Sequence, residues 1–354
     1  MSYDYYSSFF GGSKNEKPPY DSEDKELDGI IVKNAKRTHS RLFGALAIYL
    51  ILASVLNIGL VFGLYYLFPE AYGFVFRTTL GSYLSNAVIL YLICLPVFYL
   101  MIRKMEKRDL PKRRIGAVEF IGILAISQVL MLIGNYVGIF FNALIGSVIG
   151  RTATNTTVEM IQSSSIPLML IFSVVLAPIF EELLMRKLLI DRLSKFGSGF
   201  ALIVSSVAFG LFHGNFYQFF YATLLGFVLG YLYIRGGLKY SVLLHMILNF
   251  MGSVLATLYN RAGAEILSAT SQAEISPFSP LIVMLYSFLT YGLLLWGAVL
   301  LFVKFRRGEL RFSALDDARM RIPKGSVGKS VFLNVGMIVF IIVCAATMLE
   351  SLFL

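Results

Sequence analysis

The chain has 354 residues, of which 57% are hydrophobic and only 15% are charged, and its formal net charge is +10. Soluble globular domains carry about 25% charged residues, so this composition excludes an ordinary soluble domain and indicates a membrane protein. The positive charge requires no nucleic-acid partner, because basic residues accumulate beside membrane spans and attract anionic lipid headgroups. We therefore expect membrane lipids, and no nucleic acid, as partners.

Residues 1–42 precede the first apolar run. They are rich in Tyr, Ser, Lys and carboxylates to about Gly29, and they lack the basic-then-apolar layout of a cleavable signal peptide. A segment of this composition does not bury enough apolar surface to fold alone. We expect a disordered or amphipathic cytoplasmic tail.

Apolar runs long enough to be helical follow along most of the chain. A membrane span needs roughly 20 mostly apolar residues. We predict about nine segments, at 43–68, 80–102, 117–149, 166–189, 200–213, 216–234, 241–258, 281–303 and 331–354. The segment 200–213 is short, which favours a broken or re-entrant helix covered by protein.

The basic residues predict the orientation. If the N-terminus is cytoplasmic, 28 of the 31 Lys and Arg residues flank spans on that side, and only Arg77, Arg151 and Arg261 lie opposite. Lys and Arg concentrate in cytoplasmic loops. We expect a multi-pass protein of a bacterial plasma membrane with its N-terminus in the cytoplasm.

The chain divides into N-terminal membrane helices (43–165), a central region that carries the polar motifs (166–258) and C-terminal membrane helices (259–354). Gly226 and Gly230, four residues apart, predict close helix packing inside the bundle. Cys94 and Cys344 lack the spacing of a disulfide framework or thiolate metal site, so we expect both to pack in the core.

Two adjacent carboxylates, Glu181 and Glu182, lie inside the fourth apolar run. Glu182 and Arg186 are four residues apart, so they share a helix face and can pair, whereas Glu181 is rotated by about 100° and projects elsewhere. Pro178 cannot donate to the helix ladder and favours a kink just before the pair. The alternative is a surface salt bridge at a cytoplasmic helix end.

Two of the three histidines lie in later apolar segments. Phe209 and His213 share one helix face, as do His245 and Asn249. Ionisable groups inside a membrane are costly and usually mark a site or a buried hydrogen bond. Three segments that each present acid-base groups favour an active site; structural hydrogen bonding in the core is the alternative.

The rise of 1.5 Å per helical residue allows the depth of each group in the membrane to be estimated. This estimate places Glu181 and His245 roughly 8 Å and 6 Å above the inner membrane boundary, but it places His213 roughly 20 Å above that boundary. His213 therefore requires a broken helix, a later helix start or a deep cavity.

The ordered motifs Glu181-Glu182-x-x-x-Arg186, Phe209-x-x-x-His213 and His245-x-x-x-Asn249 resemble those of the CPBP family of intramembrane proteases. This family, also called Abi-type, includes CAAX prenyl endopeptidases and bacteriocin-related proteins. The resemblance covers about residues 166–258. It implies an all-α polytopic bundle of eight to nine helices with a conical intramembrane cavity.

The resemblance also implies roles for the residues. Glu181 would be the general base that activates water, assisted by His213, while His245 and Asn249 would stabilise the oxyanion. Glu182, Arg186 and Phe209 would support them. The substrate would be a hydrophobic or prenylated peptide cleaved near the cytoplasmic leaflet.

Two mechanistic alternatives are left open by the residues. Glu181, His213 and His245 could bind zinc and leave a position for water. However, Glu-Glu-x-x-x-Arg lacks the ligand spacing of His-Glu-x-x-His, and Arg186 disfavours a dication. We therefore favour a glutamate-type site without a cofactor over a metalloprotease.

Two other function classes compete with a peptidase. A catalytically silent scaffold or bacteriocin-immunity protein would use the same cavity to bind a partner. A proton-coupled transporter would also carry intramembrane Glu and His, but the sequence shows no inverted repeats.

Overall fold

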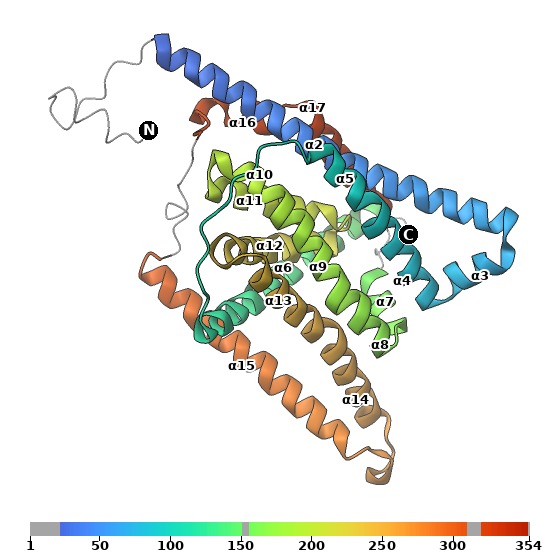
Figure 1. The fold of residues 1–354 in the computed structure, drawn as a ribbon. Coiled ribbons are helices and arrows are strands. Elements are labelled where there is room, and N and C mark those ends of the chain that lie inside the picture. Colours follow the sequence, from blue (N-terminus) through green and yellow to red (C-terminus); the bar gives the residue numbers. More distant parts are fainter. Residues whose placement is uncertain (1–21, 151–155, 310–319, 353–354) are drawn as a thin grey trace.

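The computed structural model describes residues 22–150, 156–309 and 320–352, which form helices and connecting turns without a strand. Seven helices are long and apolar enough to cross a membrane, and Figure 1 shows them gathered into one bundle: Lys25–Leu67, Thr79–Ile102, Ala117–Ile149, Ile166–Phe196, Phe216–Gly236, Leu238–Ser268 and Phe278–Arg306. Two shorter apolar helices, α11 (Ser198–Phe212) and α17 (Val335–Glu350), complete the predicted set. The predicted all-α membrane bundle is confirmed.

The remaining described elements subdivide these spans or connect them. Helices α2, α6, α12 and α15 are continuous, whereas three spans are composite. The bounds are α2 (Ser22–Leu67), α3 (Pro69–Arg77), α4 (Thr79–Ala87), η1 (Val88–Cys94), α5 (Leu95–Ile102), α6 (Ala117–Ile149), α7 (Thr156–Ser163), α8 (Ile166–Leu168), η2 (Met169–Leu176), α9 (Ala177–Glu182), η3 (Leu183–Ile190), α10 (Asp191–Leu193), η4 (Ser194–Phe196), α12 (Phe216–Gly236), α13 (Leu238–Asn249), η5 (Phe250–Leu255), α14 (Ala256–Ser268), η6 (Gln272–Glu274), α15 (Phe278–Arg306), η8 (Lys324–Ser326) and α16 (Val327–Val331).

The first helix corrects the prediction for the tail. The helix α2 already begins at Ser22, so over residues 22–42 the expected disorder is wrong and a helix with one buried face is present; residues 1–21 lie outside the described part. Ala35, His39 and Leu42 are completely buried and recur at helical spacing. The many polar residues between these positions mask the buried face in the sequence. On this face the His39 ring packs against the Phe196 ring.

Wider π-helical turns interrupt each of the three composite spans. The π-helices η1 and η2 end shortly before Pro96 and Pro178, respectively. A proline ring clashes with the carbonyl one turn earlier and lacks an N–H, so the preceding turn widens. The predicted kink before the glutamate pair is therefore a π-helical stretch, a feature common at functional sites.

The short helix α11 is one unbroken helix, so the predicted break or re-entrant turn is absent from it. It ends at His213, and Gly214 turns the chain with a φ of +65° into α12. Asn215 caps α12 by accepting a hydrogen bond from the Gln218 N–H at 2.9 Å. This tight hairpin places the α11 end inside the bundle.

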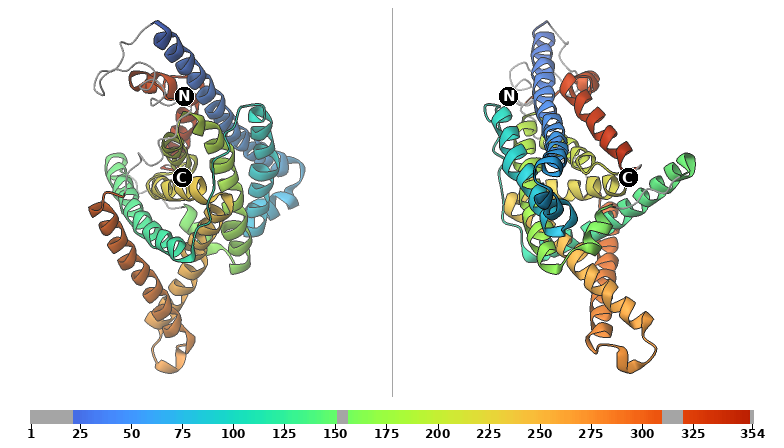
Figure 2. Two further views of the ribbon diagram at one scale, coloured as in Figure 1. Left: turned by 60° about the vertical axis from the view of Figure 1, so that its left-hand side comes forward. Right: turned by 90° about the vertical axis from the view of Figure 1, so that its right-hand side faces the viewer.

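Small residues allow α12 to approach two neighbours. A Cβ at Gly226 would lie 3.0 Å from Ser206 Cα on α11, which confirms the predicted packing inside the bundle. On the other side, Gly134 of α6 lies so close to the Tyr221 backbone that a Cβ there would overlap it. The end of the α14–α15 hairpin, in contrast, projects from the bundle (Figures 1 and 2).

We expect G134A to lower the free energy of unfolding by about 1–3 kcal/mol, because the new methyl group pushes α6 away from the α12 backbone. The matched variant G63A changes a helical glycine of α2 with nothing within 4 Å of the added Cβ. It should be neutral or stabilise by up to about 1 kcal/mol. Unfolding of both variants in detergent micelles measures the difference, and equal midpoints would contradict the packing argument.

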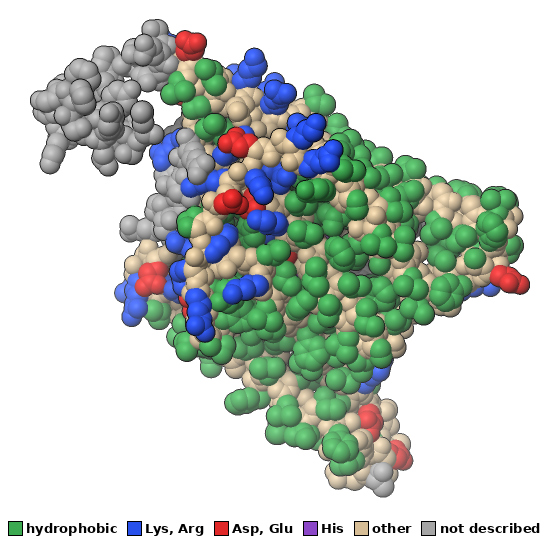
Figure 3. Space-filling model, viewed as in Figure 1, with side chains coloured by type: hydrophobic (Ala, Val, Ile, Leu, Met, Phe, Trp, Pro, Cys, Tyr) green, Lys and Arg blue, Asp and Glu red, His purple; other side chains and the backbone are tan. Residues whose placement is uncertain are grey.

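Charged side chains are unevenly distributed over the surface. Figure 3 shows Lys and Arg gathered on one side, over the start of α2 and the loop 103–116, beside a broad apolar surface. The loop is pinned to helix ends: the Arg108 N–H donates to Asp191 O at 2.7 Å, and the Arg113 N–H donates to Arg235 O at 2.8 Å. This distribution follows the pattern from which a cytoplasmic N-terminus is predicted.

Candidate active site

The site is built around two adjacent glutamates at the end of α9. Glu182 is fully buried, and its Oε2 lies 3.1 Å from the Nε of Arg186, which is also fully buried. The side chain of Glu181 is 23% exposed. The predicted division is confirmed in geometry: Glu182 pairs with Arg186, and Glu181 projects elsewhere. The alternative of a surface salt bridge is wrong, because neither paired side chain reaches the surface.

Arg186 is held on all sides by buried groups. Its Nη1 donates to Ser205 Oγ at 3.0 Å, and Ser205 in turn donates to Met185 O at 2.8 Å. Its guanidinium lies 4.7 Å from the centre of the Phe209 ring. Nη2 has no hydrogen-bond partner in the described chain, and the cation–π contact with Phe209 compensates part of that deficit.

His245 of α13 joins the two glutamates. Its Nδ1 lies 3.2 Å from Glu182 Oε1, and its Nε2 lies 3.8 Å from Glu181 Oε2. The side chain is only 4% exposed. The sequence predicted that these residues belong to one site, but not that the imidazole would lie between both carboxylates.

The other two predicted site residues lie farther along α11 and α13. Because a carbonyl only accepts, His213 donates its Nδ1–H to Phe209 O at 2.7 Å, and in the neutral ring Nε2 is then the acceptor nitrogen. Phe209 meets the rings of His213 and His245 edge-on, with centroids 4.8 and 5.9 Å away. Asn249 donates from Nδ2 to Ser173 O at 2.9 Å.

The depth estimate from the sequence separated His213 from His245, but in the structure the two side chains share a neighbour. In the structure Phe209 contacts both histidine rings, so one aromatic side chain bridges the two positions. Among the described residues, no hydrogen bond or ion pair joins His213 to Glu181 directly; the neighbour that the two histidines share is Phe209.

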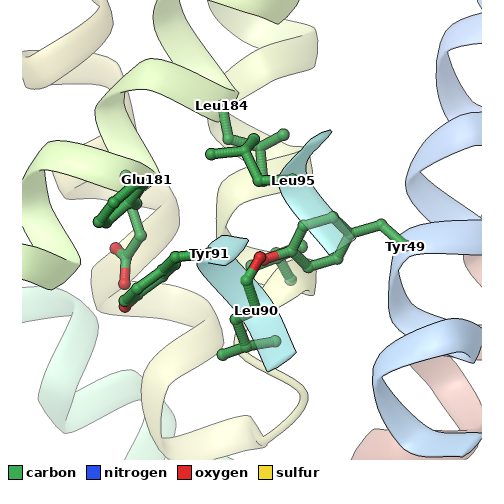
Figure 4. Close-up of a pocket in the computed structure, with 8 residues that line it drawn as sticks. Tyr49, Leu90, Tyr91, Leu95, Glu181 and Leu184 are labelled. Carbon is green, nitrogen blue, oxygen red and sulfur yellow. The ribbon is translucent and has the colours of Figure 1, made fainter. Parts of the chain in front are cut away.

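A cavity adjoins Glu181 and opens between the N-terminal helices and the central ones. It contains about 310 Å³ of empty space, counting the part open to the outside. Figure 4 shows the Glu181 carboxylate in this space, with Tyr91 pointing toward it and Tyr49 on the far side. The lining residues are Tyr49, Leu90, Tyr91, Leu95, Phe180, Glu181, Leu184 and Phe212.

Residues outside the predicted motifs complete this site. Ser205 could have been noticed as a polar residue in an apolar helix, one turn before Phe209. Tyr49 and Tyr91 lie in apolar helices outside the three motifs, so no local pattern marks them. They line the cavity of Glu181 only through the packing of the helices.

The donor set does not fit a bound metal in this arrangement. Within the described residues, no three His, Cys, Asp or Glu side chains converge as metal ligands. Both nitrogens of His245 face glutamates, and Nδ1 already contacts Glu182.

Comparisons with known proteins bear on the same region. The protein named "Putative membrane peptidase YdiL" from Bacillus subtilis (strain 168) is 32% identical over 156 residues, which are 42% of this chain and 62% of the relative. The match thus spans less than two thirds of that relative. No solved structure gives a significant match.

A family model matches residues 163–251, which include Glu181, Glu182, His213, His245 and Asn249. Its description is type II CAAX prenyl endopeptidase Rce1-like. The predicted relationship is confirmed over this segment. Over residues 163–251 the chain is thus similar to the type II CAAX prenyl endopeptidases of the Rce1-like family.

Proposed function

We propose that this protein is an intramembrane peptidase that hydrolyses a peptide bond with water activated by Glu181. One observation carries the proposal: Glu181 is the only carboxylate among the residues that line the cavity, and the other lining residues are apolar or aromatic. A partly exposed carboxylate in such surroundings can hold a water molecule and accept its proton. The family match and the membrane peptidase relative support the same reaction.

The residues behind Glu181 hold it in place. In our proposal the Glu182–Arg186 pair fixes the His245 ring through Nδ1, and the fixed ring limits where the neighbouring Glu181 side chain can lie, with Nε2 3.8 Å from Glu181 Oε2. A chain of buried, paired groups restricts the rotamers of the catalytic side chain. His213, whose Nε2 is the acceptor nitrogen in the neutral ring, is proposed to assist in proton transfer. The Phe209 ring contacts both His213 and His245.

The cavity favours a hydrophobic substrate. Leu90, Leu95 and Leu184 line it together with the rings of Phe180 and Phe212, and apolar pockets recognise apolar groups. We propose a membrane-associated peptide with apolar residues at the cleaved bond, including the prenylated class that the family name implies. With a cytoplasmic N-terminus, the basic surface of Figure 3 would face the cytoplasmic leaflet.

The proposed sequence of steps needs no covalent intermediate. The water oxygen attacks the carbonyl carbon while Glu181 takes one proton of the water. The carbonyl electrons move to oxygen, return when the intermediate collapses, and break the C–N bond. Glu181 then returns its proton to the departing amine nitrogen.

Purified protein in proteoliposomes should cleave a quenched fluorescent peptide ending in farnesyl-cysteine and three further residues. Mass spectrometry should find two products whose masses sum to substrate plus water. Added hydroxylamine should give no hydroxamate, because no acyl-enzyme forms. Absence of cleavage by the wild-type chain would count against the peptidase, and a hydroxamate product would contradict direct attack by water.

A further inference from the structure

The hydrogen-bonding groups of the cavity wall are few. Of the eight lining residues, only Glu181, Tyr49 and Tyr91 carry polar side-chain atoms. Glu181 is the proposed base, so the two phenols are the only side-chain hydrogen-bond donors on this wall. They are therefore the side chains of this wall that can donate to negative charge formed in the cavity.

The two phenols differ in what they already contact. The Tyr49 hydroxyl donates to Leu90 O at 3.0 Å and thereby ties α2 to η1. The Tyr91 hydroxyl makes no hydrogen bond to the described part of the chain. Tyr91 therefore carries the one phenolic hydrogen on the wall that is not already used by the described protein.

Tyr91 is nevertheless firmly positioned. Its ring stacks on Phe180, the residue directly before Glu181, with centroids 4.2 Å apart and planes inclined by 9°. The hydrogen bond from Tyr49 holds the main chain of the preceding residue. Figure 4 shows the resulting arrangement, in which the Tyr91 hydroxyl points toward the Glu181 carboxylate across the cavity.

The residues to which the family resemblance gives the oxyanion do not line this cavity. The buried His245 ring has Nδ1 on Glu182 and Nε2 toward Glu181. Asn249 directs its amide to Ser173 O. Neither belongs to the wall that includes Glu181.

We infer that Tyr91 is a catalytic residue that donates a hydrogen bond to the oxyanion formed when water held by Glu181 attacks the substrate carbonyl. The inference rests on the proposed peptidase function. In this step the carbonyl π electrons move to oxygen, the phenol O–H stays intact and donates, and its hydrogen bond is lost again when the C=O re-forms. A fixed donor aimed at developing charge stabilises the transition state more than the ground state.

The inference also gives the N-terminal helices a part in the chemistry. Tyr91 lies in η1, outside the segment 163–251 that matches the family model. Glu181 and its proposed oxyanion donor thus come from different parts of the chain. Loosening the contact of η1 with α9 should reduce turnover without touching any of the predicted motifs.

The test is Tyr91→Phe, which keeps the ring and its stacking on Phe180. We expect kcat on the quenched farnesyl peptide to fall about 10²-fold, in the range for loss of one oxyanion donor, with KM changed less than about twofold. A phosphinic peptide, whose tetrahedral oxygen mimics the oxyanion, should lose the same factor in affinity. The matched control is Tyr99→Phe, an exposed tyrosine on α5, which should behave as wild type.

Three outcomes would overturn the inference: an unchanged kcat in Y91F, a phosphinic-peptide affinity that does not fall with kcat, or a thermal midpoint lowered by several degrees. A lowered thermal midpoint would mean that the Tyr91 hydroxyl makes a hydrogen bond that stabilises the fold. If Glu181→Gln is inactive while Y91F turns over normally, only the inference fails. If Glu181→Gln stays active, the proposed function itself fails.

Discussion

Glutamine at position 181 is expected to lower kcat on a cleavable peptide by about 10²–10⁴-fold. The amide keeps the size of the side chain but accepts no proton from water, and general-base catalysis contributes about 10²–10⁴-fold. His245 Nε2, 3.8 Å from Glu181 Oε2, stays in place because Glu182 holds the other ring nitrogen. Single-turnover kinetics with purified E181Q measure the loss directly.

Two further variants separate the base from its surroundings. Glu181→Asp keeps a carboxylate but withdraws it from the cavity, so we expect an intermediate loss of kcat. Glu70→Gln removes an exposed carboxylate from α3, away from the cavity lining, and should leave turnover unchanged. If E181Q retained more than about a tenth of wild-type kcat, Glu181 would not be the base, and a silent scaffold or transporter would become the better hypothesis.

Much of the helical architecture could be predicted because it depends on local pattern. Each of the nine predicted apolar segments contains a helix, since segments of this length and composition satisfy their backbone groups within the membrane only by forming helices. The start of α2 could not be predicted, because residues 22–42 mix buried positions such as Ala35 and His39 with many charges. Tertiary packing decides whether such a segment folds.

The site could be predicted only as far as helix periodicity extends. The pairing of Glu182 with Arg186 follows from a spacing of four residues on one helix, and the structure confirms it. The position of His245 between two glutamates depends on how α13 crosses α9, and the approach of Tyr91 depends on α2 and η1. No local sequence motif specifies how these helices cross.

The buried ion pair behind the site should be the most sensitive part of the fold. We expect Arg186→Met to lower the free energy of unfolding by about 3–5 kcal/mol, because Glu182 would remain buried without its cationic partner. The hydrogen bond to Ser205 and the contact with Phe209 disappear as well. Unfolding in detergent micelles, compared with Arg77→Met at an exposed position, measures the loss.

A double variant distinguishes the cost of an unpaired charge from the loss of packing. Glu182→Gln combined with Arg186→Met removes both charges while the amide can still accept a hydrogen bond from His245 Nδ1. We expect it to be more stable than R186M alone by at least about 1 kcal/mol, so that the two substitutions are not additive. Additive losses would mean that packing around Arg186, and not its charge, stabilises the site. A neutral amide at position 182 would orient His245 less firmly than the carboxylate does. Turnover of the double variant should therefore stay low even though its stability is partly restored. This result would separate the effect of the Glu182–Arg186 pair on folding from its effect on Glu181.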